Sequence, residues 1–140
     1  MNDMIPGYVV DGIVIGDKTI EKKPEAVRSF CRALVQAFKF IRENEVKARK
    51  SLPNYTSVPE AVAMKCALRE VSPDGREPLE LIRFQVSMFK HFGFLIDDLA
   101  IESIVDYRFL PVPKPGWEDE RREEIGFDEK EWMEALLRGS

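Results

Sequence analysis

Residues able to perform acid, base or metal chemistry are few and scattered in this chain. His91 is the only histidine, so no imidazole relay and no site with several histidine ligands can form. The neighbouring carboxylates Asp97 and Asp98 would suit acid and base catalysis only in an apolar pocket that raises a pKa, and no such pocket is indicated. They more simply predict the cap of a helix. We therefore predict a protein that is not an enzyme, with no catalytic residues, no metal and no cofactor.

The cysteines and the early glycines also indicate structure rather than chemistry. Cys31 and Cys66 lie on separate predicted helices without other ligands at metal-binding spacing, which favours buried free thiols over a disulfide. Gly7, Gly12 and Gly16 do not form the glycine-rich loop that holds a phosphate ahead of a helix. None of these residues predicts a binding site.

Composition favours one soluble domain with a modest core. The chain has 140 residues, of which 44% are hydrophobic and 33% charged, and a formal net charge of -4. Because both signs are mixed along the sequence, no basic face is available for phosphates, and we expect no nucleic-acid partner. The N-terminus does not have the pattern of a signal peptide, and no apolar run reaches transmembrane length.

Residues 8 to 15, Tyr-Val-Val-Asp-Gly-Ile-Val-Ile, predict one strong strand. No second strand of similar strength follows, and a lone strand leaves its backbone N–H and C=O groups unpaired. We therefore expect a mainly helical α/β fold with four or five helices packed on this strand. The sheet would be completed by another chain or by a symmetry mate, which predicts a homo-oligomer formed through strand pairing.

A long amphipathic helix is predicted to begin at Pro24 and to end near Asn44. Residues 45 to 51 then predict a short helix. The spacing of three and four residues marks one side of the long helix as the side that faces the core. The apolar residues of this predicted core-facing stripe are Val27, Phe30, Cys31, Leu34, Phe38 and Ile41.

Three further helices follow. Ser57 and Glu60 fit a capping box, which predicts a helix from there to about Val71. A second helix from Leu79 should end at Gly93 in a left-handed conformation. The third is a short helix that Asp97 or Asp98 would cap, with Ile101, Ile104 and Val105 on its apolar side.

The chain is predicted to have three parts. Residues 1 to 110 form the folded body, and the proline-rich residues 111 to 116 form an extended linker. Residues 117 to 140 form a charged tail with a short helix, for which Asp128 begins a second capping signature. Trp132 and Leu136 give that helix a small apolar face, which could contact the body or a partner.

The order of these features resembles the C-terminal portion of ABC-transporter substrate-binding proteins of the nitrate, sulfonate, taurine and thiamine-pyrimidine family, which are type 2 periplasmic binding proteins. The resemblance covers about residues 5 to 110. Glu45 replaces a proline of the family, and the tail is longer and more charged than is usual there. Besides the predicted strand, the resemblance rests on the sequence segments Lys23 to Leu34, Ile41 to Glu45, Phe89 to Leu95 and Val105 to Leu110.

The resemblance implies a partial lobe of a two-lobed receptor that binds a small-molecule solute for import through an ABC permease. It implies a periplasmic or cell-surface location, although a cytoplasmic one is open for a segment without a signal peptide. Tyr8 and Asp11, on the strand nearest the ligand cleft, are the only candidate ligand contacts. The alternative for both is an ordinary strand aromatic and a strand-end carboxylate.

The alternative function is a small self-associating interaction domain. In it, the strand at residues 8 to 15 would pair with a symmetry mate and the acidic tail would recruit a partner. A pyrimidine-synthesising enzyme, which some relatives of the family are, is disfavoured because the cysteine-rich signature of that class is missing from the sequence. The sequence does not identify which solute such a receptor would bind.

Overall fold

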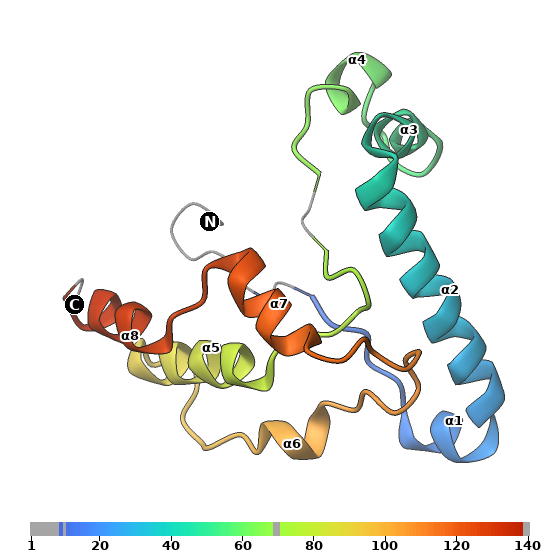
Figure 1. Cartoon of the computed structure of the whole chain (residues 1–140). Coiled ribbons are helices and arrows are strands. Elements are labelled where there is room, and N and C mark those ends of the chain that lie inside the picture. The colour runs from blue at the N-terminus through green and yellow to red at the C-terminus, as the bar shows by residue number, and fades with distance from the viewer. Residues whose placement is uncertain (1–8, 10, 69–70, 139–140) are drawn as a thin grey trace. The chain divides into compact units, whose positions relative to one another are not determined.

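The computed structural model describes residues 9, 11–68 and 71–138, and all regular secondary structure in this part of the chain is helical (Figure 1). The helices are α1 (Asp17–Lys22), α2 (Pro24–Glu43), α3 (Glu45–Ser51), η1 (Leu52–Asn54), α4 (Glu60–Ala63), α5 (Leu79–His91), α6 (Ile101–Ile104), α7 (Trp117–Ile125) and α8 (Glu129–Arg138), of which η1 is a 3-10 helix. None of these described helices is long and apolar enough to cross a membrane.

The chain divides into two compact units, which are described separately below. Unit 1 comprises Met1–Gly16, Glu77–Arg108 and Val112–Ser140, and it contains α5, α6, α7 and α8. Unit 2 comprises Asp17–Arg76 and Phe109–Pro111, and it contains α1 to α4. Each unit is therefore assembled from segments that are distant in the sequence.

The predicted strand at residues 8 to 15 is wrong, and with it the α/β lobe and the sheet completed by another chain. Val9 and residues 11 to 15 have no regular secondary structure, while Tyr8 and Val10 lie outside the described residues. The Gln85 carboxamide takes the place of a neighbouring strand: its Oε1 accepts from the Val9 N–H at 2.9 Å, and its Nε2 donates to the Val9 carbonyl at 2.7 Å. One side chain on a helix thus satisfies the backbone at Val9 without a sheet.

In unit 2, the predicted helices at Pro24 and at residue 45 are confirmed. Pro24 occupies the first turn of α2, and the helix ends at Asn44, whose N–H donates to the Phe40 carbonyl. The core-facing stripe is only partly buried, because Val27 and Cys31 are buried whereas Phe30 is 48% exposed. Periodicity therefore identified the helix but overstated how much of it the unit covers.

The predicted helix from the Ser57 capping box to Val71 is wrong. Its helical part, α4, covers four residues, and no side chain caps its N-terminus. The helix ends at Met64, whose carbonyl accepts from the Arg49 guanidinium at 2.7 Å. A long-range donor thus occupies a carbonyl that a longer helix would have used in its own ladder.

In unit 1, α5 forms as predicted and supplies most of the core. Leu81, Phe84 and Met88 are its buried residues. The helix ends at His91, Gly93 just beyond it has a φ of 74°, and the Phe94 N–H donates back to the Phe89 carbonyl at 2.8 Å. This confirms the glycine C-terminal cap, because the left-handed conformation is accessible to glycine at little cost.

The two predicted carboxylate caps in unit 1 have opposite outcomes. Asp128 caps α8, since its Oδ1 accepts from the Glu131 N–H at 2.9 Å. Neither Asp97 nor Asp98 caps α6, which begins at Ile101 without a side-chain cap. Asp98 instead forms an ion pair with Lys90 at the end of α5.

Candidate interaction groove in unit 1

The residues singled out from the sequence do not meet in a shared site within the described structure. Tyr8 lies outside the described residues, and Asp11 is exposed in a segment without regular structure, so their role as ligand contacts stays a prediction. His91 is exposed at the end of α5, and its ring lies edge-on to Phe92. Among the described residues, no group of three or more His, Cys, Asp or Glu side chains could hold a metal ion.

Arg121 on α7 is the most deeply buried cation of unit 1. Its side chain is 5% exposed and donates through Nε and Nη2 to the two carboxylate oxygens of Glu77, each at 2.9 Å, and through Nη1 to Glu124 at 2.8 Å. The Tyr107 hydroxyl donates to the Glu77 carbonyl at 2.8 Å and accepts from the Glu77 N–H at 3.2 Å. This bidentate geometry fastens α7 to the chain just ahead of α5.

The same contacts set the charge state of Arg121. Burial by itself would lower the pKa of the guanidinium, but the hydrogen bonds and the charges of Glu77 and Glu124 outweigh burial and raise the pKa. The group therefore stays a cation and cannot exchange a proton near neutral pH. It is a structural clamp rather than a catalytic group.

Sequence reasoning missed this clamp because it described residues 117 to 140 only as a charged tail and assigned no role to the arginines within it. A signal was present in the spacing of Trp117, Arg121 and Ile125, which puts the arginine between two large apolar residues on one face of α7. Ile125 is buried and Trp117 is half-buried, with its ring edge-on to Tyr107. An arginine in such a stripe predicts a buried ion pair, although nothing near Arg121 in the sequence identifies Glu77 as its partner.

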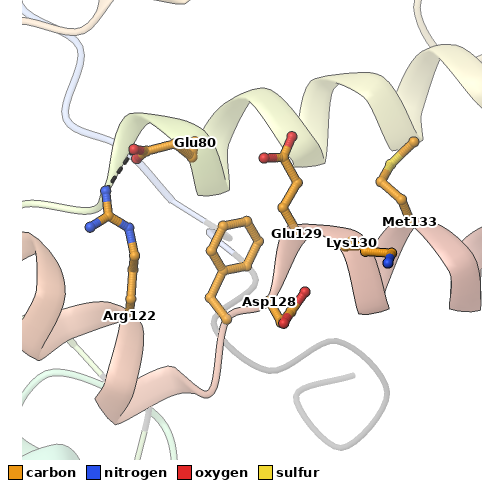
Figure 2. Close-up of a pocket in the computed structure, with 7 residues that line it drawn as sticks. Glu80, Arg122, Asp128, Glu129, Lys130 and Met133 are labelled. Atoms are coloured by element: carbon orange, nitrogen blue, oxygen red, sulfur yellow. Dashed lines mark hydrogen bonds and ion pairs between the residues drawn. The ribbon is translucent and has the colours of Figure 1, made fainter.

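An open groove with a volume of about 630 Å³ lies on unit 1 where α5, α7 and α8 meet (Figure 2). Figure 2 shows Glu80 of α5 facing Arg122 of α7, and the two form an ion pair at 2.6 Å. Glu129 and Lys130 belong to the first turn of α8. The complete lining is Glu80, Arg122, Phe127, Asp128, Glu129, Lys130 and Met133.

The groove rests on an aromatic cluster. The Phe84, Phe127 and Trp132 rings meet edge to face, with centroids 6.2 Å apart for Phe84 and Phe127, 5.4 Å for Phe84 and Trp132, and 4.8 Å for Phe127 and Trp132. Such contacts add to the burial of apolar area and fix the relative position of α5 and α8. The groove is therefore a preformed feature of unit 1.

Glu80 and Arg122, which face each other in the groove, each stabilise the charged form of the other. The pKa of Glu80 is lowered, first by a hydrogen bond from its own backbone N–H and then by the hydrogen bond and charge of Arg122. Glu80 in turn raises the pKa of Arg122. The ion pair of Glu80 and Arg122 is therefore not poised for proton transfer near neutral pH. The groove presents charged side chains around the apolar side chains of Phe127 and Met133.

A smaller hollow of about 340 Å³ lies in unit 2. Its two arginines donate to backbone carbonyls, Arg42 to Val71 at 3.0 Å and Arg49 to Met64 at 2.7 Å. These bonds hold the segment after α4 against α2 and α3. The arginines of this hollow therefore have a structural role, and we do not assign a binding function to it.

Comparison of the chain with protein-family models, with curated proteins and with solved structures finds no match. The predicted family membership and import function therefore stay predictions, and the α/β lobe that they implied is not formed by the described residues. Function has to be argued from the groove and from the exposed surfaces.

Proposed function

We propose that this chain is a non-catalytic interaction module that binds a basic, amphipathic segment of a partner protein in the groove of unit 1. The observation that carries the proposal is the groove itself, which combines apolar side chains with a net acidic rim. Phe127 and Met133 can receive apolar side chains, and the flexible thioether of methionine adapts to different shapes. A helix presenting apolar residues every three or four positions fits such a groove.

The net charge around the groove indicates which partner segments it can bind. Residues 117 to 138 contain nine acidic and four basic side chains, whereas the whole chain has 25 and 21. Within the groove, Glu80 and Arg122 neutralise each other, which leaves Asp128 and Glu129 against Lys130. The surface around the groove is therefore net acidic, and it should attract lysine and arginine side chains and repel acidic segments.

Binding can be tested with two short labelled peptides, one an amphipathic helix of leucine and lysine and the other its leucine and glutamate counterpart. In fluorescence anisotropy titrations, the basic peptide should bind and the acidic peptide should not. Glu129→Lys reverses a charge at the groove and should weaken binding of the basic peptide by about tenfold. Met133→Glu should weaken it by at least as much, because it places a charge where an apolar side chain would be received.

Glu123→Lys is the matched control, because it makes the same charge reversal at an exposed position of α7 that does not line the groove. It should leave binding within about twofold of the unchanged chain. Equal weakening by Glu123→Lys and Glu129→Lys would show that the basic peptide recognises net charge and not the groove. Binding of the acidic peptide with the same affinity would contradict the proposed partner chemistry.

A further inference from the structure

The longest helix, α2, has a second apolar stripe that unit 2 leaves exposed. Phe30, Ala33, Ala37 and Phe40 follow one another at steps of three, four and three residues, which aligns them along one side of the helix. All four are exposed, with Phe30 at 48% and Phe40 at 46%. Two half-exposed aromatic rings in line with alanines form a continuous apolar surface, which on a soluble protein marks an interaction site.

This stripe is distinct from the side of α2 that faces the core of unit 2. The buried residues of the helix are Val27 and Cys31, and at 100° per residue they lie about a third of a turn from the middle of the stripe, with Phe30 at the edge nearest to them. The cations Arg28, Arg32 and Lys39 lie on a third side of the helix, between the buried residues and the opposite edge of the stripe. The apolar surface of α2 is thus wider than its own unit uses.

The stripe is palindromic, and this property selects a second copy of the chain as its occupant. Reading from either end gives Phe-x-x-Ala-x-x-x-Ala-x-x-Phe, centred on residue 35. If two copies of α2 pack antiparallel about a two-fold axis at that point, Phe30 meets the partner's Phe40 at both ends, and Ala33 meets the partner's Ala37 in the middle. Small side chains at the centre let the two backbones approach, while the rings cover the ends.

The polar residues along one edge of the stripe are compatible with the same antiparallel pairing of two α2 helices. Ser29, Gln36 and Glu43 flank it on its polar side. About the same axis, Gln36 meets its own copy, and Ser29 meets the partner's Glu43, so no like charges are opposed there. Along this edge, therefore, an antiparallel pair brings neutral residues against neutral or charged ones.

We infer that the protein forms a symmetric dimer in which α2 pairs antiparallel with α2 of a second copy through Phe30, Ala33, Ala37 and Phe40. A single helix pair covers less than the roughly 800 Å² per partner of a stable interface, so the dimer should dissociate on dilution. Self-association was predicted from the sequence, but here a helix face replaces strand pairing. The inference does not depend on the groove of unit 1.

Sedimentation equilibrium over a range from low micromolar to submillimolar concentration tests the dimer. The average mass should rise with concentration from the 16.1 kDa of the chain toward twice that value. Ala33→Glu places two negative charges near the two-fold axis and should lower the association constant by at least about tenfold. Ala61→Glu, which makes the same change at an exposed position of α4, is the control and should not alter association. A mass that stays at one chain, or equal behaviour of the two variants, would overturn the inference.

Disulfide trapping tests the direction of the helices. Chains carrying Ala33→Cys and chains carrying Ala37→Cys are oxidised separately and as a mixture, in a Cys66→Ser background that removes the half-buried native thiol. An antiparallel pair predicts far more covalent dimer in the mixture than in either protein alone, because position 33 faces the partner's position 37. Efficient trapping in each separate protein but not across them would indicate a parallel pair and would overturn the arrangement. Far-UV circular dichroism establishes that each variant remains folded.

Discussion

Unit 1 and unit 2 are stabilised in different ways. The helices of unit 1 are short, but specific polar contacts hold them across long sequence distances, as between Arg121 and Glu77, which are 44 residues apart. Unit 2 also has long-range polar contacts, as between Arg42 and Val71, but it has the longest helix and only Val27 and Cys31 of α2 are buried. The comparison shows that helix length and amphipathicity do not measure how firmly an element is held. Directional contacts and complete burial determine this more directly.

Tryptophan fluorescence can follow one unit selectively, since both tryptophans of the chain, Trp117 and Trp132, lie in unit 1. Hydrogen exchange of α2 reports on unit 2. The expected difference is that the amides of α5 exchange more slowly than those on the exposed side of α2. The predictions that follow use these two signals.

The largest effect is expected from Phe84→Ala. Phe84 is 5% exposed and contacts both Phe127 and Trp132, so its removal leaves a cavity under the groove. The free energy of unfolding of unit 1, measured by urea titration of tryptophan fluorescence, should fall by about 3 to 5 kcal/mol. The matched change Phe30→Ala, on the exposed side of α2, should alter stability by less than about 0.5 kcal/mol at concentrations where the chain is monomeric. Similar losses in the two variants would contradict the distinction between the units.

A smaller but still large effect is expected from Arg121→Met. This change leaves the Glu77 carboxylate, which is 17% exposed, without its bidentate partner, and should cost unit 1 about 3 kcal/mol. Arg122→Met removes the next residue, whose side chain is 29% exposed, and should cost about 1 kcal/mol or less. In the double variant Arg121→Met with Glu77→Gln, part of the stability should return, because the more buried of the two carboxylates that contact Arg121 no longer carries a charge, while Glu124 is more exposed. Equal costs for Arg121→Met and Arg122→Met would contradict the role assigned to the buried pair.

The two arginines also show what the sequence could and could not reveal. Pro24, Gly93 and Asp128 act through their own backbone or the nearest turn, and the structure confirms the helix boundary that each predicted. Arg121 and Arg122 stand side by side in one charged run, yet only Arg121 is buried. The spacing of Trp117, Arg121 and Ile125 indicates locally which arginine faces the core, but the carboxylate of Glu77 that receives it lies 44 residues away, so local patterns alone cannot identify the partner.

The prediction of a strand at residues 8 to 15 was wrong for the same reason, because its outcome depends on a residue that is distant in the sequence. The residues around Val9 have the composition of a strand, but a strand also needs a neighbouring backbone. The Gln85 carboxamide supplies both hydrogen bonds at Val9 from 76 residues away. The candidate groove could likewise not be predicted, because its lining comes from α5, α7 and α8 and depends on how these helices pack. The sequence indicated the acidic character of the tail and the apolar side chain of Trp132, which contacts Phe84, but not the groove that they help to form.

The smallest effect expected is a dependence of unit 1 stability on acid pH through Glu80. The pKa of Glu80 is lowered in the folded chain by its own backbone N–H and by Arg122, so the unfolded chain binds the proton more tightly. The contribution to stability is therefore complete above the ordinary carboxylate pKa of about 4.3 and is lost as the pH falls through the lower, folded pKa. Because the side chain is 37% exposed, solvent screening should keep this contribution below about 1 kcal/mol.

Urea titrations of tryptophan fluorescence at pH 7 and pH 3 measure this contribution. In Glu80→Gln the loss of stability between the two values should be smaller than in the unchanged chain, whereas Glu123→Gln, which removes an exposed carboxyl of the same unit, should leave it nearly unchanged. If Glu80→Gln were as sensitive to acid as the unchanged chain, the ion pair with Arg122 would contribute nothing measurable to unit 1. The contrast between the units would then rest on the buried clamp at Arg121 and on the aromatic cluster alone.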